Sequence, residues 1–456
     1  MSRVDRSALP TPGPSAAFRF PEIHHQTLSN GLRVKAIAHQ NVPVLTAVLL
    51  APSGTAADPP DRPGLTAFVA DLLDEGSAGK SAIEVSDALA RYGADLDVDV
   101  GPDAVVIALT TLTRFGAGAL ALLAEMVIAP NLAEPDIERV RKLRLERLVQ
   151  LRDHAPAVAE RAFMRLLYRD HPYGHLSLGS EEALEATTPA EIRRLQRGAF
   201  RPAQVTVVIA GDDTPDALIG GVAAAFEGWR PAPDAEAIDP NAGLRPPPRA
   251  ADRHLAIVAR SGAAQSELRI GHVCASRDTP DYHALVLLNM ILGGQFVSRV
   301  NMNLRQDKGY TYGVRTGFDL RRGIGPFALQ TSVQTEVTAP AVREALRELE
   351  DIRGARPATA EELSIARASV TRGYPRGFET SQQVARGVAQ LALHGLPDSY
   401  FEEFVPRIEA VSLDDVNRAA ATYLDPARMV TLAVGDRDRI AGELSALLGE
   451  PLMVST

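Results

Sequence analysis

The stretch "GLTAFVADLLDEGS", residues 64–77, places small and acidic side chains in a row on one face of a predicted helix. Its apolar residues recur at helical spacing and predict a buried stripe; they are Leu65, Phe68, Val69, Leu72 and Leu73. The opposite stripe consists of Ala67, Ala70, Asp71 and Asp74. Such a row is compatible with an acidic binding site, with an ordinary solvated face, or with a functional site that has lost its functional residues.

Histidine and cysteine, the other residue types that often bind metals, offer weaker patterns. His171 and His175 in "HPYGH" are four residues apart, but Pro172 and Gly174 disfavour a helix that would bring them onto one face. We expect a loop whose histidines make structural hydrogen bonds. The single cysteine, Cys274, lies in the apolar run "LRIGHVCAS" and predicts a buried, inert thiol, because one cysteine cannot form a disulfide framework or a multi-thiolate metal site.

The composition is that of a soluble globular protein, with 45% hydrophobic and 23% charged residues among 456. A net charge of −9 argues against nucleic acid or an anionic membrane as a partner. The N-terminal residues are polar and proline-rich, and the longest apolar runs, such as "VPVLTAVLLA", are only as long as a strand. We therefore expect a cytoplasmic protein. Its basic segment "ERVRKLRLERLVQLR" predicts a helix with a solvated face or one that meets acidic residues.

A segment rich in proline, alanine and aspartate divides the chain into two halves of similar size. The halves repeat each other, because "TTPAEIRRLQRGAFRPAQVTVVIAGD" in the first matches "VSLDDVNRAAATYLDPARMVTLAVGD" in the second at an offset of 224 positions without a gap. Each copy opens on a capping box, at Thr188 and at Ser412. The predicted organisation is a disordered arm (1–20), an N-terminal domain (21–229), a linker (230–253) and a C-terminal domain (254–456).

Strand patterns alternate with amphipathic helices in both halves. The first half offers a hairpin at Asn30-Gly31 and the strand "DAVVIALTTL", and the second offers the strand "GPFALQTSV" followed by a long helix. The predicted fold class is α+β, with two homologous domains that each have an antiparallel sheet with helices packed on one face.

The second half contains "LLNMILGGQFVSRVNMNLRQDKGYTYGVRTGF", and here the chain resembles the insulinase, pitrilysin and mitochondrial processing peptidase family of zinc metallopeptidases. That family carries an Arg and a Tyr seven residues apart, which fall on Arg305 and Tyr312, with Tyr310 as a neighbour. "LSNGLRV", the helix at residues 64–77, "HPYGHLSLG" and "RPAQVTVVIAGD" follow in the family's order over nearly the whole chain. The resemblance implies a half-clamshell of two α+β domains.

In active members of the family the first of these helices carries H-x-x-E-H, two metal ligands with a general base between them. Those positions fall on Ala67, Ala70 and Asp71, so both histidines and the base are absent. The family's further Glu ligand would lie in "RKLRLERLVQLRDH", where Glu146 is the nearest acid. Since zinc needs three protein ligands and an open position, we expect no metal on this chain and no peptide hydrolysis by it alone.

The sequence retains the Arg/Tyr pair although it lacks the metal ligands. A guanidinium and a phenol can donate to a carbonyl oxygen that becomes an oxyanion during attack on a peptide bond. The resemblance implies that Arg305 and Tyr312 act in trans at the zinc of a paralogous partner that carries H-x-x-E-H. We therefore predict a non-catalytic subunit of a heterodimeric metallopeptidase that binds extended peptides.

Three alternatives stay open at this point. The Arg/Tyr pair could cap a strand and have only a structural role. The chain could be a peptide-binding or scaffold protein that keeps the fold but has no part in hydrolysis. It could also be a hydrolase with a relocated metal site, although the sequence offers no second histidine cluster at ligand spacing.

Overall fold

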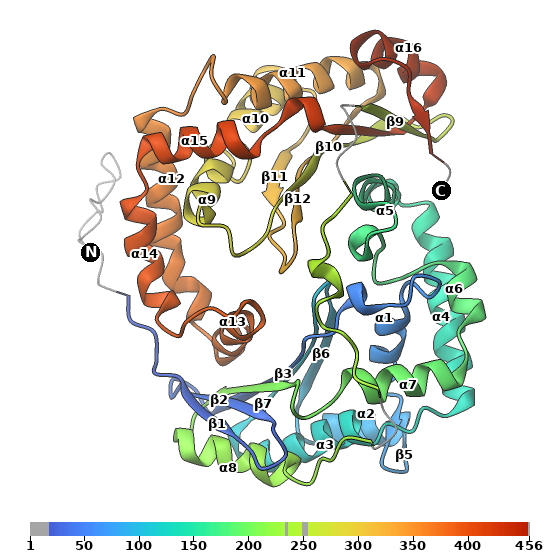
Figure 1. Ribbon diagram of the computed structural model, residues 1–456, viewed down its shortest axis with the longest axis vertical. Helices are drawn as coiled ribbons and strands as arrows, with labels where there is room; N and C mark the ends of the chain where they lie inside the picture. The colour runs from blue at the N-terminus through green and yellow to red at the C-terminus, as the bar shows by residue number, and fades with distance from the viewer. Residues whose placement is uncertain (1–17, 233–235, 249–253, 455–456) are drawn as a thin grey trace, which may run out of the picture.

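A computed structural model describes residues 18–232, 236–248 and 254–454, and each half of the chain forms one six-stranded sheet (Figure 1). The first sheet has the order β1-β2-β8-β3-β7-β6, with the bounds His24–Thr27, Arg33–Ala38, Thr206–Gly211, Val44–Ala51, Val105–Leu112 and Asp95–Val100. The second has the order β11-β12-β10-β13-β9-β14, with the bounds Val314–Phe318, Gly325–Gln334, Gln265–Ala275, Val430–Gly435, His254–Ala259 and Leu452–Met453. A two-stranded sheet pairs β4 (Gly76–Ser77) with β5 (Lys80–Ser81).

The two sheets confirm the predicted duplication. Read from β6 and from β11, they have the same order of equivalent strands, and the offset of 224 positions relates β8 to β13. Both predicted capping boxes are present, from Thr188 at the start of α7 (Pro189–Ala199) and from Ser412 at the start of α15 (Leu413–Tyr423). The outermost strands differ in their place along the chain. β1 is the first strand of its half, whereas β14 is the last strand of the other half.

The α+β fold class is confirmed, and the sheets differ from the prediction in one detail, because they are mixed and not wholly antiparallel. Most neighbouring strands are antiparallel, but β2 pairs with β8, and β9 with β13 and β14, in parallel. The parallel pairs arise because β8 and β13 return to the sheet only after the long helical segments of their halves.

Helices make up much of the rest of the described chain. The first half has α1 Leu65–Ala70, α2 Ala82–Arg91, α3 Gly116–Ile128, α4 Glu134–Arg152, α5 Ala155–Tyr168, α6 Glu181–Ala186, α7 and α8 Pro215–Phe226. The second has α9 Tyr282–Leu292, α10 Arg299–Asn301, α11 Thr338–Asp351, α12 Ala360–Gly373, α13 Ser381–His394, α14 Tyr400–Ala410, α15 and α16 Arg437–Leu448. Short 3₁₀ turns include η1 Thr55–Ala57, η2 Thr113–Phe115, η3 Pro172–Gly174, η4 Ala242–Leu244, η6 Thr335–Val337, η7 Tyr374–Phe378 and η8 Pro426–Arg428.

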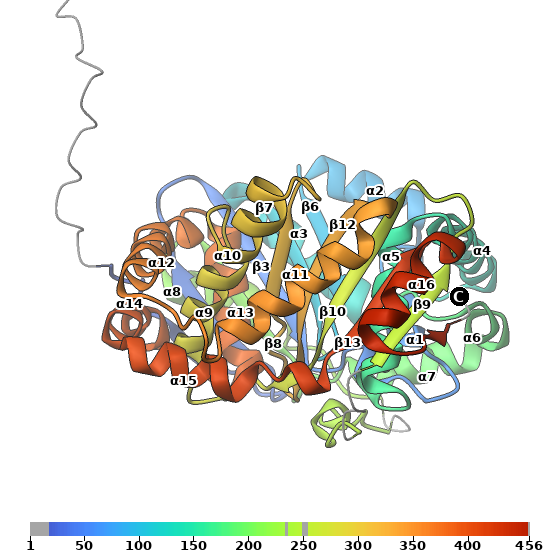
Figure 2. The ribbon, with the colours of Figure 1, turned by 90° about the horizontal axis from the view of Figure 1, so that it is seen from above.

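Each sheet is covered on its two faces by helices from different halves, whereas the sequence predicted helices on one face. α3 and α8 pack on the first sheet and α11 and α16 on the second, as Figure 2 shows for the latter pair. The other face of the first sheet receives α13 from the second half, and the other face of the second sheet receives α5 from the first half. Strand β3 is buried along nearly its whole length, so both of its faces need a cover.

This exchange of helices ties the halves together. Val384 and Val388 of α13 are each at most 1% exposed. Burial of two such side chains contributes roughly 3–4 kcal/mol, which is a sizeable fraction of the stability of a domain. Polar contacts add to it, since Ser381 of α13 hydrogen-bonds Thr46 of β3 at 3.0 Å between the hydroxyl oxygens.

A second contact between the halves centres on Tyr173 of η3. Its hydroxyl donates to the carboxylate of Asp103 at 2.5 Å and accepts from the backbone N–H of Gly323 at 3.0 Å. Within the predicted linker, Gly243 lies so close to Tyr173 that a Cβ there would be 2.6 Å from the ring. Arg322 also donates to the Pro240 carbonyl at 2.6 Å, so the described part of the linker, residues 236–248, is packed against both halves.

Two further predictions concern the ends and the surface of the chain. Most of the predicted arm lies outside the described residues; of its last three residues, Phe18 and Phe20 pack against aromatic side chains of the second half, with ring centres 4.5 Å apart for Phe20 and Phe401. Within the described residues, no helix has the combination of length and apolar character that a membrane span requires.

Candidate functional site

The first candidate position lies at the end of helix α1, which is shorter than the helix predicted over residues 64–77. It begins after Gly64, whose positive φ of 90° suits glycine, and ends at Ala70. Asp58 holds its first turn by accepting hydrogen bonds from the N–H groups of Gly64 and Thr66, both at 2.7 Å. After Asp71 the backbone hydrogen bonds shift to shorter turns, so Asp74 lies outside the helix.

The three positions of the zinc motif do not form a metal site, and they carry no base that could activate a metal-bound water. Ala67 and Ala70 are buried, and their methyl groups are part of the packed interior. Asp71 forms an ion pair with Arg144 of α4. Arg144 is itself only 5% exposed and donates a second hydrogen bond to the Ser177 carbonyl at 2.7 Å. The one potential ligand is therefore neutralised by a fixed guanidinium, and zinc does not fit this set of residues.

The acidic residues around Asp71 do not replace the missing ligands. Glu146 points to solvent, with its carboxylate 3.9 Å from the Lys142 ammonium, so the face of α4 turned to α1 carries Arg144 in its place. Loss of solvent around the carboxylate and the negative charge of Glu75 raise the pKa of Asp74. Across the described ranges, no three histidine, cysteine, aspartate or glutamate side chains come together closely enough to hold a metal.

The "HPYGH" histidines have structural roles, as predicted. His171 Nδ1 accepts from the backbone N–H of Tyr173 at 3.1 Å, and His171 Nε2 donates to the Arg245 carbonyl at 2.8 Å. Burial lowers the pKa of His171, which favours its neutral form. His175 contacts Asp58 at 3.1 Å and so supports the start of α1.

The remaining candidates for chemistry are Cys274 and the basic helix. Cys274 of β10 was predicted to be buried and is only partly so, but loss of solvent raises the pKa of its thiol to about 12, which disfavours the reactive thiolate. The basic helix α4 meets acidic residues through the Arg144–Asp71 pair and through a second pair between Arg139 and Glu75.

The second candidate position is the Arg/Tyr pair of the other half. Helix α10 continues into η5, a π-helical turn at Met302–Asp307 that contains Arg305. The guanidinium of Arg305 lies 4.0 Å from the ring centre of Phe296, which is itself 65% exposed. Tyr312 is 95% exposed. A π-helical turn is rare and occurs often at functional sites.

The loop that carries Tyr312 is fixed although its side chain is free. The buried amide of Asn301 donates to the Val314 carbonyl at 2.8 Å and accepts from the Val314 N–H at 3.0 Å. The hydroxyl of Thr331 donates to the Gly313 carbonyl at 2.9 Å. The backbone that follows Tyr312 therefore has a defined position, and the phenol extends into solvent.

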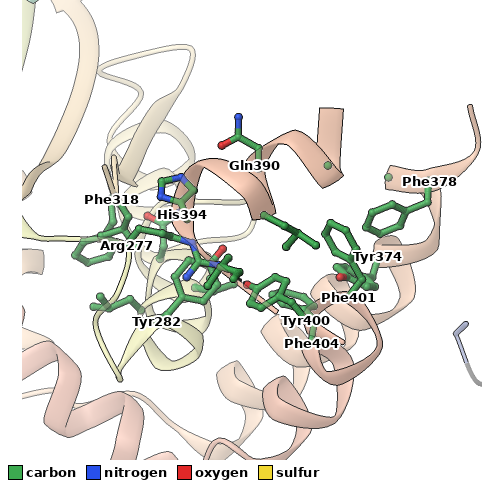
Figure 3. Close-up of a pocket in the computed structure, with 18 of the residues that line it drawn as sticks. Arg277, Tyr282, Phe318, Tyr374, Phe378, Gln390, His394, Tyr400, Phe401 and Phe404 are labelled. Carbon is green, nitrogen blue, oxygen red and sulfur yellow. Dashed lines mark hydrogen bonds between the residues drawn. The ribbon is translucent and has the colours of Figure 1, made fainter. Parts of the chain in front are cut away.

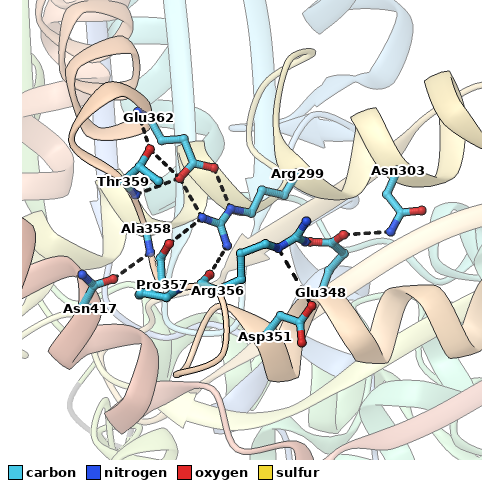
Figure 4. Close-up of polar contacts among 10 residues, drawn as sticks. All are labelled: Arg299, Asn303, Glu348, Asp351, Arg356, Pro357, Ala358, Thr359, Glu362 and Asn417. Atoms are coloured by element: carbon cyan, nitrogen blue, oxygen red, sulfur yellow. Dashed lines mark hydrogen bonds and ion pairs between the residues drawn. The ribbon is translucent and has the colours of Figure 1, made fainter.

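A polar network holds the helix that carries Arg305 (Figure 4). Arg299 at the start of α10 forms a two-point ion pair with Glu362 of α12, with N–O distances of 2.6 and 2.7 Å. Burial opposes ionisation of Glu362, but these hydrogen bonds lower its pKa overall. One turn further on, Asn303 donates to Glu348 of α11 at 2.7 Å. Arg305 is thus presented from a braced helix.

The structure does not bring the two candidate positions together within this chain. Ala67, Ala70 and Asp71 belong to the first half, and Arg305 and Tyr312 to the second. Among the described residues no hydrogen bond or ion pair joins the two sets. Sequence reasoning missed Arg144 and Phe296, and only the run of arginines in α4 hinted at the first.

Sequence models of one peptidase family match both halves of the chain. The model described as insulinase (peptidase family M16) matches residues 33–180, and that described as peptidase M16 inactive domain matches residues 186–370. The chain belongs to the insulinase family. This member lacks the H-x-x-E-H residues, because Ala67, Ala70 and the Asp71 that pairs with Arg144 stand in their place.

Curated relatives and a solved structure support this assignment. An uncharacterized zinc protease of Mycobacterium bovis is 25% identical over 85% of this chain and 87% of its own length. A non-peptidase homolog of Helicobacter pylori is 22% identical over 78% of this chain and 80% of its own length. The crystal structure of a peptidase M16 inactive domain from Pseudomonas fluorescens covers 91% of this chain and 98% of its own, with 24% identity and a TM-score of 0.83. The fold is that of a two-domain insulinase-family protein.

Proposed function

We propose that this insulinase-family chain is a non-catalytic subunit that completes a zinc peptidase together with a paralogous partner chain carrying H-x-x-E-H. The observation that carries the proposal is the contrast between its two candidate positions. Zinc does not fit the motif positions because Arg144 neutralises Asp71, whereas Tyr312 is 95% exposed, seven residues after the braced Arg305. An aromatic side chain held in full solvent exposure suits contact with something outside the chain.

In this proposal Arg305 and Tyr312 bind and polarise the carbonyl of the peptide bond to be cut. The guanidinium and the phenol each donate a hydrogen bond, and both bonds strengthen as the carbonyl oxygen gains negative charge. The partner contributes the metal and the general base. This chain holds the carbonyl in place and stabilises the oxyanion, but it does not itself break the bond.

The substrate that suits this site is an extended peptide. Strand β11 begins at Val314, two residues after Tyr312, and lies at the edge of the second sheet. An edge strand can add a peptide as a further strand through main-chain hydrogen bonds. A peptide bound there would run past the Arg/Tyr pair. That the subunit works in the cytoplasm stays a prediction.

The test is a pull-down of the tagged full-length chain from its native host, followed by mass spectrometry. We expect a near-stoichiometric partner whose sequence carries H-x-x-E-H. Purification of the chain without a partner, as a homodimer that holds no zinc, would contradict the proposal. Every motif position in such a dimer lacks metal ligands.

A second candidate function is peptide binding without any role in hydrolysis, and strand β6 favours it. This strand is an edge of the first sheet, beside α1, and its sequence DLDVDV exposes Asp95, Asp97 and Asp99 on one face. Such an edge suits an extended peptide with basic side chains. Tight binding of a lysine-rich peptide by the isolated chain, lost in Asp95→Asn/Asp99→Asn but not in Arg305→Ala, would support this function over the first.

A further inference from the structure

A cavity of about 620 Å³ lies in the second half, apart from both candidate positions (Figure 3). Helices α9, α13 and α14, the turn η7 and the end of β11 surround it. Its volume is within the range of roughly 300–1,000 Å³ that is typical of small-molecule sites. None of the residues that line it belongs to the zinc motif or to the Arg/Tyr pair.

One end of the cavity is a preformed aromatic wall. Tyr374 and Phe404 stack with ring centres 4.4 Å apart and planes 14° from parallel. Phe378 and Phe401 meet edge to face at 4.9 Å. Phe20 supports both of these rings through its own aromatic contacts. Because the rings hold one another, an apolar ligand would find this wall already formed, and its binding would cost little ordering of side chains.

The other end carries a single positive charge. Figure 3 shows Arg277 and His394 there, away from Tyr374 and Phe378. The Arg277 guanidinium lies 3.5 Å from the ring centre of Tyr282 and donates to the Tyr400 hydroxyl at 2.6 Å. Burial and then the charge of Arg277 lower the pKa of His394 to about 4, so this imidazole is neutral near pH 7.

That charge has no counter-ion. No aspartate or glutamate lines the cavity, and among the described residues Arg277 makes no ion pair. Arg277 has five N–H donors, and Tyr400 accepts from only one of its nitrogens. A guanidinium fixed between rings, with donors to spare and no carboxylate in the cavity lining, is complementary to an anion brought by a ligand.

Two further features keep the cavity open and polar at one point. Gly387 lies inside helix α13, where a glycine costs about 1 kcal/mol relative to alanine. A Cβ at this position would lie 3.2 Å from the Phe401 ring, so the glycine preserves space between the helix and the aromatic wall. The hydroxyl of Tyr374 is buried without a hydrogen-bond partner and can bind a polar group of a ligand.

We propose that this cavity binds a small carboxylate with a hydrophobic body, the carboxylate on Arg277 and the body against the aromatic wall. The charge decides the ligand class, because a cation without a counter-ion disfavours amines, and the aromatic lining disfavours small polar anions. This inference does not depend on the proposed subunit function, since it uses none of the same residues.

Isothermal titration calorimetry with decanoate on the full-length chain tests the proposal, with decan-1-ol and decylamine as ligands of similar length without the negative charge. We expect one decanoate per chain, and at least about tenfold weaker binding of both controls. The variant Arg277→Gln should lose at least about tenfold in affinity for decanoate, while Arg277→Lys, which keeps the charge, should lose less.

Thermal melts of both variants show whether they fold, and the decanol titration reports whether the apolar part of the cavity is intact. The proposal is overturned if decanoate does not bind at concentrations up to about 1 mM, the weak limit for a specific site. It is equally overturned if decylamine binds as well as decanoate, or if folded Arg277→Gln binds decanoate with unchanged affinity.

Discussion

The guanidinium beside Asp71 leads to a specific prediction about restoring the metal site. The variant Ala67→His/Ala70→Glu/Asp71→His rebuilds H-x-x-E-H at the end of α1, and so restores two of the three protein ligands that zinc needs. Arg144 remains in contact with the side chain at position 71, however, and its second hydrogen bond to the Ser177 carbonyl keeps it there. We expect this variant not to hold stoichiometric zinc.

The size of the effect follows from the charges. Ligand atoms lie about 2 Å from zinc, so a guanidinium that touches the ligand side chain lies about 4 Å from the ion. Two unit charges at that distance interact by about 4 kcal/mol at an effective dielectric constant of 20, and a divalent ion doubles this to about 8 kcal/mol of repulsion. If Arg144 moves and escapes half of it, about 4 kcal/mol remains, which is roughly a thousandfold loss in zinc affinity.

The assay is metal analysis of purified protein after equilibration with zinc and removal of free metal. A matched variant adds Arg144→Glu to the three substitutions, which removes the repulsion and supplies a third protein ligand. We expect close to one zinc per chain in this fourfold variant and far less in the threefold one, with circular dichroism to show that both fold. Equal zinc content and affinity in the two variants would refute the reasoning.

Three other predictions concern stability. Tyr173→Phe removes a hydroxyl that links the two halves. Asp103 Oδ1 then loses its donor and the Gly323 N–H its acceptor, although Asp103 Oδ2 keeps the Arg322 N–H, so urea denaturation should show a loss of about 2 kcal/mol. Asn301→Ala should cost about 2–3 kcal/mol in the same assay and raise the mobility of the Tyr312 loop, seen as faster amide exchange. Burial first of all lowers the pKa values of His283 and His394 to about 4. Between pH 6.5 and 4 only the unfolded chain gains these protons, so the free energy of unfolding falls as the pH falls. At pH 5 it should be about 2 kcal/mol lower than at pH 7, allowing for the partial exposure of both side chains. Stability that rises on acidification would contradict this.

The repeat could be predicted because short sequence patterns in each half indicate it. The capping boxes at Thr188 and Ser412 and the strands that follow lie at a constant offset, and each signal depends on residues a few positions apart. The structural roles of His171 and His175 followed in the same way, since Pro172 and Gly174 disfavour an α-helix there, and the two histidines flank the short 3₁₀ turn η3 in its place.

The exchange of α5 and α13 between the sheets was not predictable from such signals. The pattern of an amphipathic helix predicts that one face is buried, but it does not predict which sheet packs on that face. The unbroken apolar run of β3 does indicate burial on both faces, and it was the available hint that a helix from elsewhere must pack there.

The contacts of the candidate site divide in the same way. The loss of the metal ligands could be read from Ala67 and Ala70 directly. The pairing of Asp71 with Arg144 could not, because the two residues are 73 positions apart, and a rotation of α4 by about half a turn decides whether Arg144 or Glu146 faces α1. The exposure of Tyr312 depends in turn on the Asn301 contacts to Val314, which only the folded chain makes.

The central claim is that Arg305 and Tyr312 act at the zinc of a partner chain. The most direct measurement is peptide turnover by the complex with the H-x-x-E-H partner, comparing Arg305→Ala and Tyr312→Phe with the neighbouring control Tyr310→Phe. We expect kcat to fall by about 10²–10³-fold in the first two, as for loss of an oxyanion donor, and to stay near the wild-type value in the control. Unchanged turnover in Arg305→Ala and Tyr312→Phe, with the complex intact, would contradict the claim.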